Sequence, residues 1–179
     1  TGAVCMTLFN NMIMLFLGIE ILSVSLYVLA GSKKSDPSSN ESALKYFLLG
    51  AFATGFLLFG IALVYGATGS FDLEKIAGSI SEGTPMLKAG ITLLLVAMAF
   101  KVSAAPFHFW APDVYEGAPT PVTGFMAAVV KTAAFAAFLR LFMNGFSSIH
   151  EVWAPTVWII SALTILVGNI AATEIGRAH

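Results

Sequence analysis

Five apolar stretches, separated by polar segments, recur along the chain. They cover about residues 12–30, 43–67, 86–105, 121–143 and 152–172. About 20 apolar residues in a helix cross the hydrocarbon core of a bilayer, so each stretch is long enough to span it. The pattern predicts an all-α fold, a polytopic transmembrane helix bundle that forms one membrane domain over residues 1–179.

The segments between the apolar stretches contain residues typical of turns and helix ends. Residues 3–9 resemble the last turns of a further helix, and a polar loop is predicted over residues 32–42. Within the connection 69–85, residues 72–77 are expected to form a short surface helix. We expect the chain to be a fragment of a longer membrane protein.

Composition supports the membrane class and excludes several others. Hydrophobic residues make up 58% of the 179 residues and charged residues 11%, whereas soluble domains carry about 25% charge. The net charge of -1 and the absence of a basic face make nucleic acid an improbable partner. Cys5 is the only cysteine, and His108, His150 and His179 lie far apart, so no metal-ligand spacing is present. No nucleotide-binding motif occurs, so we expect neither metals nor cofactors on this chain.

The segment between the third and fourth stretches is the most unusual part of the sequence. Lys101 closes the third stretch, and four prolines follow between residues 106 and 121. Pro106 has no backbone N–H, which leaves a carbonyl near Lys101 without its helical partner. Non-helical backbone at membrane depth requires protein or water around it. The segment therefore predicts a broken helix near residues 101–118 that lines a hydrated cavity.

Two ionisable residues lie near the centres of apolar stretches. Lys131 is out of reach of either membrane surface, and its cost of insertion favours a role in proton transfer. An amine removed from water also gives up its proton more readily than one in water. Glu20 is either a protonated carboxyl that bonds to a neighbouring helix or a proton-binding site, alone or as half of a buried ion pair.

Three further ionisable residues leave alternatives open. Lys45 lies near the start of its stretch, where it could extend to the lipid headgroups or pair with Glu41 one turn earlier. If Lys45 is deep, Glu20 is its expected partner. Lys101 could also extend to the surface, or lie beside the helix break. His108 either bonds to a loop carbonyl or relays protons, since the imidazole of histidine titrates near neutral pH.

The remaining polar and aromatic residues of the break have structural interpretations. Asp113 and Glu116 are expected to act as helix caps or surface pairs. Trp110 and Tyr115 are expected to anchor the segment at the membrane surface.

These residues together resemble a known family. The segments Phe16-Leu-Gly-Ile-Glu20 and Pro106-Phe-His-Phe-Trp-Ala-Pro-Asp-Val-Tyr-Glu-Gly-Ala-Pro-Thr-Pro-Val-Thr123, with Lys101 and Lys131, are similar to the antiporter-like subunits of respiratory complex I. The form Asp-Val-Tyr-Glu-Gly-Ala-Pro resembles the subunit N, or subunit 2, branch. The resemblance implies most of the first of two inverted five-helix units.

The resemblance also implies a function. It indicates a proton-translocating subunit of NADH:quinone oxidoreductase in the inner (plasma) membrane of a bacterium. Its proton-transfer residues would be Glu20 paired with Lys45, then Lys101, His108 and Lys131. Other membrane subunits would be its partners, and NADH, FMN, iron–sulfur clusters and quinone would be held by partner subunits. A subunit of a multisubunit sodium/proton antiporter and a non-transporting membrane scaffold are the alternatives.

Overall fold

The computed structural model describes residues 1–80 and 83–174, and His179 lies outside this part of the chain. Regular structure there is helical apart from one isolated backbone bridge between Asn11 and Asp72. The α-helices are α1 (Gly2–Leu8), α2 (Met12–Ala30), α3 (Pro37–Thr68), α4 (Leu73–Ser79), α5 (Pro85–Val102), α6 (Trp110–Gly117), α7 (Thr120–Phe125), α8 (Lys131–Arg140) and α9 (His150–Glu174). The π-helical turns η1 (Met126–Val130) and η2 (Leu141–Gly145) flank α8, and the short 3-10 turn η3 (Ser147–Ile149) precedes α9.

Side-chain caps fix where the helices begin. The side chain of Asn11 accepts a hydrogen bond from the N–H of Ile13 at the start of α2. Asp36 caps α3 in the same way, and Asp72 caps α4. Each cap satisfies a backbone donor that has no partner inside its helix.

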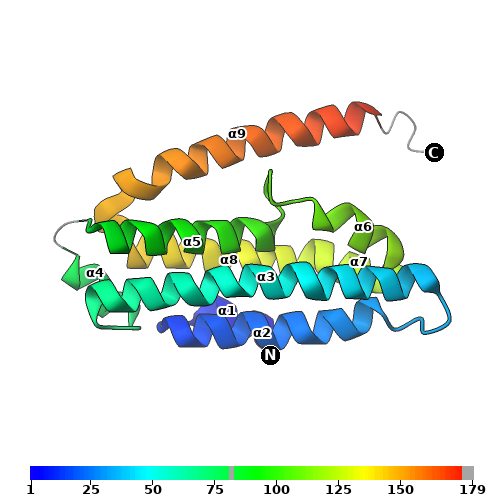
Figure 1. The fold of residues 1–179 in the computed structure, drawn as a ribbon, viewed down its shortest axis with the longest axis horizontal. Coiled ribbons are helices and arrows are strands. Elements are labelled where there is room, and N and C mark those ends of the chain that lie inside the picture. The colour runs from blue at the N-terminus through cyan, green and yellow to red at the C-terminus, as the bar shows by residue number, and fades with distance from the viewer. Residues whose placement is uncertain (81–82, 175–179) are drawn as a thin grey trace.

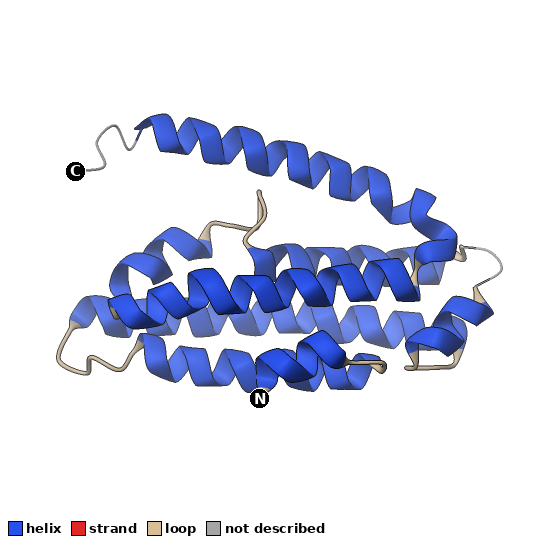
Figure 2. Ribbon diagram, turned by 180° about the vertical axis from the view of Figure 1, so that it is seen from behind, coloured by secondary structure: helices blue, strands red, loops and turns tan. Residues whose placement is uncertain are grey.

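The long helices run side by side with nearly aligned axes. α2, α3, α5 and α8 form the body of the bundle, whereas α9 diverges from it (Figures 1 and 2). α3 and α5 approach closely at Gly60 and Gly90, since a Cβ added at Gly60 would lie 3.0 Å from the carbonyl oxygen of Gly90. Small residues at such crossings are typical of helix packing in membranes.

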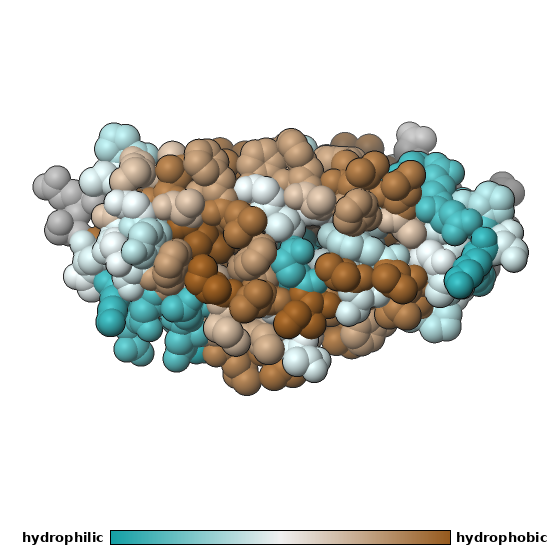
Figure 3. Space-filling view, turned by 60° about the horizontal axis from the view of Figure 1, so that its bottom comes forward, coloured by the Kyte–Doolittle hydropathy of each residue, from teal (hydrophilic) through white to brown (hydrophobic). Residues whose placement is uncertain are grey.

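The surface agrees with a bilayer environment. In the described part of the chain, five helical segments are long and apolar enough to cross a membrane: Met12–Ala30, Pro37–Thr68, Pro85–Val102, Thr120–Gly145 and Ser147–Thr173. Apolar side chains cover most of the middle of one face, and polar side chains gather toward its two ends (Figure 3). The predicted polytopic all-α bundle is therefore confirmed.

The boundaries of two helices differ from the expected ones. α3 begins at Pro37, inside the polar segment predicted as a loop, because the Asp36 cap starts the helix before its apolar part begins. α5 ends at Val102 instead of continuing to residue 105. The short helix expected near residues 72–77 is present as α4.

Candidate proton-transfer site

The predicted helix break follows α5. Ser103 ends α5 with a φ of 56°, in the left-handed region, and non-helical backbone follows up to α6. Protein groups bond to this backbone. The indole N–H of Trp110 donates to the carbonyl of Phe100 at 3.0 Å, and the N–H of Ala105 donates to the Thr164 hydroxyl at 2.9 Å. The break is thus tolerated at membrane depth because side chains satisfy the backbone groups that it frees.

Lys101 is buried one residue before the end of α5. Its residue is 7% exposed, so the alternative in which it extends to the membrane surface is wrong. The Nζ atom donates to the hydroxyl of Ser23 on α2 at 2.6 Å, and that hydroxyl donates to the carbonyl of Ile19 at 2.6 Å. The ammonium is therefore held between two helices by a neutral group.

A small cavity lies next to Lys101. Its volume is about 20 Å³, and the polar residues Ser23, Tyr27, Thr54 and Lys101 are among those that line it. A cavity of about 10–15 Å³ by this measure can hold one water, provided that polar partners are present. The site can therefore accept a single water between α2, α3 and α5.

Glu20 reaches the same region from α2. One carboxyl oxygen, Oε1, accepts a hydrogen bond of 2.7 Å from the hydroxyl of Thr54 on α3. Thr54 also lines the cavity beside Lys101. The carboxyl and the buried lysine are thus connected through hydroxyl groups and a space for one water.

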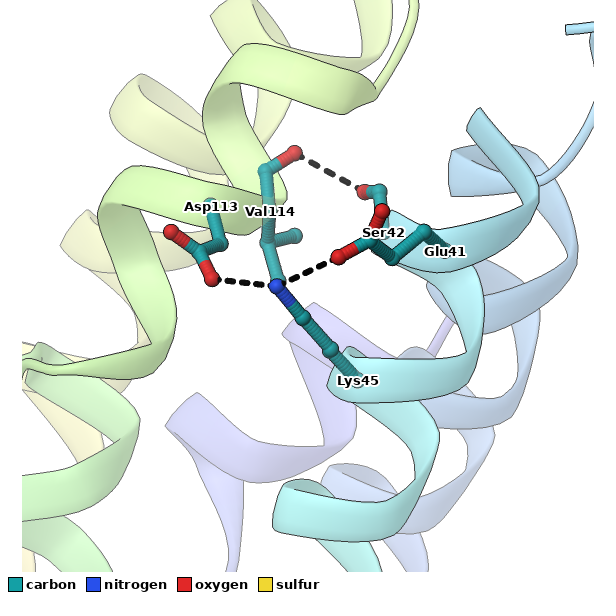
Figure 4. A network of polar contacts seen from close by, with 5 residues as sticks. All are labelled: Glu41, Ser42, Lys45, Asp113 and Val114. Atoms are coloured by element: carbon teal, nitrogen blue, oxygen red, sulfur yellow. Dashed lines mark hydrogen bonds and ion pairs between the residues drawn. The ribbon is translucent and has the colours of Figure 1, made fainter. Parts of the chain in front are cut away.

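The expected ion pair between Glu20 and Lys45 is wrong. Lys45 Nζ lies 2.7 Å from Glu41 Oε1 and 2.6 Å from Asp113 Oδ2, and its side chain is 42% exposed (Figure 4). Thr54, the partner of Glu20, lies nine residues further along α3, which corresponds to about 13 Å of helix. The alternative pairing with Glu41 is confirmed, as is the expectation that Asp113 forms a surface pair.

α6 is held against α3 beside this pair. The Ser42 hydroxyl donates to the carbonyl of Val114 at 3.0 Å (Figure 4). A Cβ added at Gly117 would lie 2.5 Å from the carbonyl oxygen of Ser38, so only glycine fits this approach of the two helices. Lys45 thus belongs to the contact between α3 and α6.

Lys131 is the first residue of α8 and lies near the middle of the segment Thr120–Gly145. Its Nζ donates to the hydroxyl of Ser103, at the helix break. The same Nζ lies 5.0 Å from the centre of the Trp110 ring and 6.0 Å from that of Tyr115. Among the described residues, no carboxylate oxygen lies within 4.0 Å of the amine of Lys131 or of Lys101.

Three further residues of the break, Trp110, His108 and Tyr115, have buried side-chain atoms. Trp110 is only 3% exposed because α6 folds back against α3 and buries the ring, so the prediction that its side chain anchors on the lipid surface is wrong. His108 Nδ1 and the Tyr115 hydroxyl are buried and have no hydrogen-bond partner in the described part of the chain. Burial raises the pKa of the Tyr115 phenol. The hydrogen bond of His108 to a loop carbonyl, one of its two alternatives, is absent at Nδ1.

Sequence reasoning identified the charged residues but missed their partners. Ser23, Thr54 and Ser103 each bond to a deep ionisable group, yet isolated hydroxyl residues are common in apolar helices. Spacing offered a partial signal: Ser23 lies one turn after Glu20. A hydroxyl can both donate and accept a hydrogen bond, so it can serve a charged or a neutral partner. The arrangement is suited to groups that gain and lose protons.

These features define a class of protein: a polytopic membrane helix bundle with hydroxyl-paired ionisable side chains beside a broken helix. Comparison with known sequences makes the class specific. Residues 10–175 match the family model described as NADH:quinone oxidoreductase/Mrp antiporter, TM, and the chain belongs to this family.

Individual relatives agree with this assignment. NADH-quinone oxidoreductase subunit N of Cytophaga hutchinsonii is 57% identical over 172 residues, which are 96% of this chain and 37% of the relative. A chain in the structure of respiratory complex I from Thermus thermophilus with bound aureothin is 44% identical, with a TM-score of 0.81 over 96% of this chain and 36% of that one. A chain of the Mrp complex from Dietzia sp. shares the fold, with a TM-score of 0.72 and 23% identity. The match covers 82% of this chain and 28% of that one. The chain spans about a third of the length of its curated relatives.

Proposed function

We propose that the chain is part of an N-type membrane subunit of NADH:quinone oxidoreductase and contributes residues that translocate protons. The observation that carries the proposal is the pairing of each deep ionisable group with a hydroxyl: Glu20 with Thr54, Lys101 with Ser23, and Lys131 with Ser103. A carboxylate partner would favour the charged lysine strongly, whereas a hydroxyl leaves both protonation states accessible. High identity to subunit N relatives supports the particular complex.

The proposed proton path uses the residues around the helix break. Glu20 exchanges protons with Lys101 through the Thr54 and Ser23 hydroxyls and one water in the cavity between them. Lys131 receives the proton next, at the start of α8, and His108 serves as a further relay at the break. Lys45 remains a candidate for proton transfer by resemblance alone, because its contacts favour a role in holding α6 against α3.

The chain would carry no redox chemistry of its own. In this proposal NADH, FMN, iron–sulfur clusters and quinone are held by partner subunits, and neighbouring membrane subunits of the complex contact this one. The sequence relatives are bacterial, which favours the plasma membrane as the location. Electron transfer in the partners would drive proton movement here by changing the electrostatic field at Glu20 and Lys101.

Replacing the buried lysines in the full-length subunit, within its assembled complex, tests this function. Lys131→Ala and Lys101→Ala are each expected to reduce NADH:quinone reductase activity and proton uptake into membrane vesicles together. Lys88→Ala is the matched control, since Lys88 is an exposed lysine on the same helix as Lys101. Unchanged proton uptake in both buried-site variants would leave the scaffold alternative. Sodium-dependent proton exchange in vesicles without an NADH dehydrogenase would favour the antiporter alternative.

A further inference from the structure

The amine of Lys131 lies over an aromatic surface. Its Nζ is 5.0 Å from the centre of the Trp110 ring and 6.0 Å from that of Tyr115, and Ser103 is its hydrogen-bond partner. A cation within about 6 Å of an aromatic face is attracted to it, most strongly for tryptophan and where water is excluded. In the described part of the chain, no carboxylate pairs with Lys131. The indole is therefore the group that favours its ammonium form.

Trp110 is fixed from several directions. Its indole N–H donates to the carbonyl of Phe100 at 3.0 Å, at the end of α5. Tyr46 of α3 stacks on the ring at 4.9 Å with an interplanar angle of 7°, and Phe100 stacks at 5.4 Å. Tyr115 of α6 meets it edge-on at 6.0 Å. The ring is buried and held by side chains of α3, α5 and its own helix α6, so it presents its face to Lys131 in one position.

The other titratable groups near Lys131 do not replace this contact. α8 packs against α1, which carries Cys5, and against α5, which carries Lys88 and Lys101. The centre of the Tyr115 ring lies 6.0 Å from the amine, and the Tyr115 hydroxyl has no hydrogen-bond partner in the described part of the chain. The Trp110 ring and the Ser103 hydroxyl are thus the groups that hold the amine of Lys131.

We propose that Trp110 is a positioning residue for proton transfer, which holds the ammonium of Lys131 at the helix break through its indole face. This inference deepens the proposed function and rests on it for the role of Lys131. Trp110 also bonds to Phe100, the residue next to Lys101. The same ring therefore fixes the end of α5, which carries Lys101, and supports the charge on α8.

Direct titration of Lys131 tests the inference. The full-length subunit in its membrane complex is labelled with trace acetic anhydride over a range of pH, and acylation of Lys131 is measured by mass spectrometry relative to exposed Lys88. Only the neutral amine reacts, so the pH of half-maximal labelling reports its protonation. Trp110→Leu removes the aromatic face and is expected to lower this pH by about one unit. Trp110→Phe keeps a weaker aromatic face and is expected to shift it in the same direction by less.

Trp153→Leu is the matched control. Trp153 is also buried, and its indole N–H donates to the carbonyl of Phe146 at 2.9 Å. Its variant should leave the labelling of Lys131 unchanged. The inference would be overturned by an equal shift of the half-labelling pH in Trp153→Leu, or by no downward shift in either Trp110 variant. If Trp110→Leu does not assemble, the result for Trp110→Phe is used in its place. Labelling needs no NADH, so it tests the contact separately from the proposed function. A lower pH of half-maximal labelling in Trp110→Leu, together with normal proton pumping in Lys131→Ala, would support the contact and refute the proposed function.

Discussion

Removing the hydroxyl of Ser23 should destabilise the bundle through the buried charge of Lys101. Ser23 accepts the hydrogen bond from Lys101 Nζ at 2.6 Å, and the lysine is 7% exposed, so bulk water does not reach the amine to replace this partner. A hydrogen bond to a charged group contributes about 1.5–3 kcal/mol. The bond from Ser23 to the Ile19 carbonyl adds little, because such bonds within a helix turn do not stabilise it. We therefore expect Ser23→Ala to lower the free energy of unfolding by about 2 kcal/mol.

A control on the same helix separates the two effects. The Ser25 hydroxyl donates to the carbonyl of Ile21 at 2.8 Å and is exposed, so it makes the same kind of helix bond without a lysine partner. Ser25→Ala should change stability by less than about 0.5 kcal/mol. The assay is unfolding of the full-length subunit in mixed micelles, followed by circular dichroism as denaturing detergent is added.

A double variant provides the decisive result. Ser23→Ala combined with Lys101→Met removes the unpaired charge, and replacing a buried charge by an apolar side chain of similar size is often neutral or stabilising. The double variant should therefore regain most of the lost stability. If it is as unstable as Ser23→Ala alone, or if Ser23→Ala and Ser25→Ala are equal, the hydrogen bond does not hold Lys101 as the structure indicates.

Two further predictions concern the other contacts of the site. Thr54→Val removes the hydrogen-bond donor to Glu20 and should slow proton uptake into membrane vesicles by about tenfold. This factor corresponds to the free energy of about one hydrogen bond to a charged group. Thr54→Ser keeps the hydroxyl and should retain most of the uptake. Gly117→Ala places a Cβ 2.5 Å from the carbonyl oxygen of Ser38 and should cost about 1–3 kcal/mol in the same detergent assay. Gly124→Ala, with no atom within 4 Å of the added Cβ, should not destabilise the protein. Equal losses from the two glycine variants would contradict the close packing of α6 on α3.

Much of the fold could be predicted from the sequence because the bilayer imposes a simple rule. A helix that crosses the membrane must be mostly apolar, so the segment Met12–Ala30 is visible as a long apolar stretch in spite of Glu20. The helix break was predictable as well, since Pro106 cannot continue a helix and follows Lys101 closely. Helix starts within polar sequence, such as Pro37, depend on a local cap and were placed too late.

The partner of Lys45 could not be predicted because it depends on where a short helix folds. Sequence distance favoured Glu41, and the family resemblance favoured Glu20. The second actual partner, Asp113, lies 68 residues away on α6. Only the return of α6 onto α3, fixed in part by Gly117, brings that carboxylate to the lysine. The same return buries Trp110, whose amphipathic ring is equally common at membrane surfaces.

The hydroxyl partners escaped prediction for an energetic reason. A lysine at the centre of a membrane helix costs at least about 2.5–3.5 kcal/mol to insert, so its presence alone demands an explanation. A serine bonds to a carbonyl in its own helix, as both Ser23 and Ser25 do, and needs no external partner. The two residues are therefore indistinguishable in sequence, although only Ser23 receives Lys101. In this family fold the charged residues show that a site exists, and the position of α2 relative to the end of α5 determines which hydroxyl completes it.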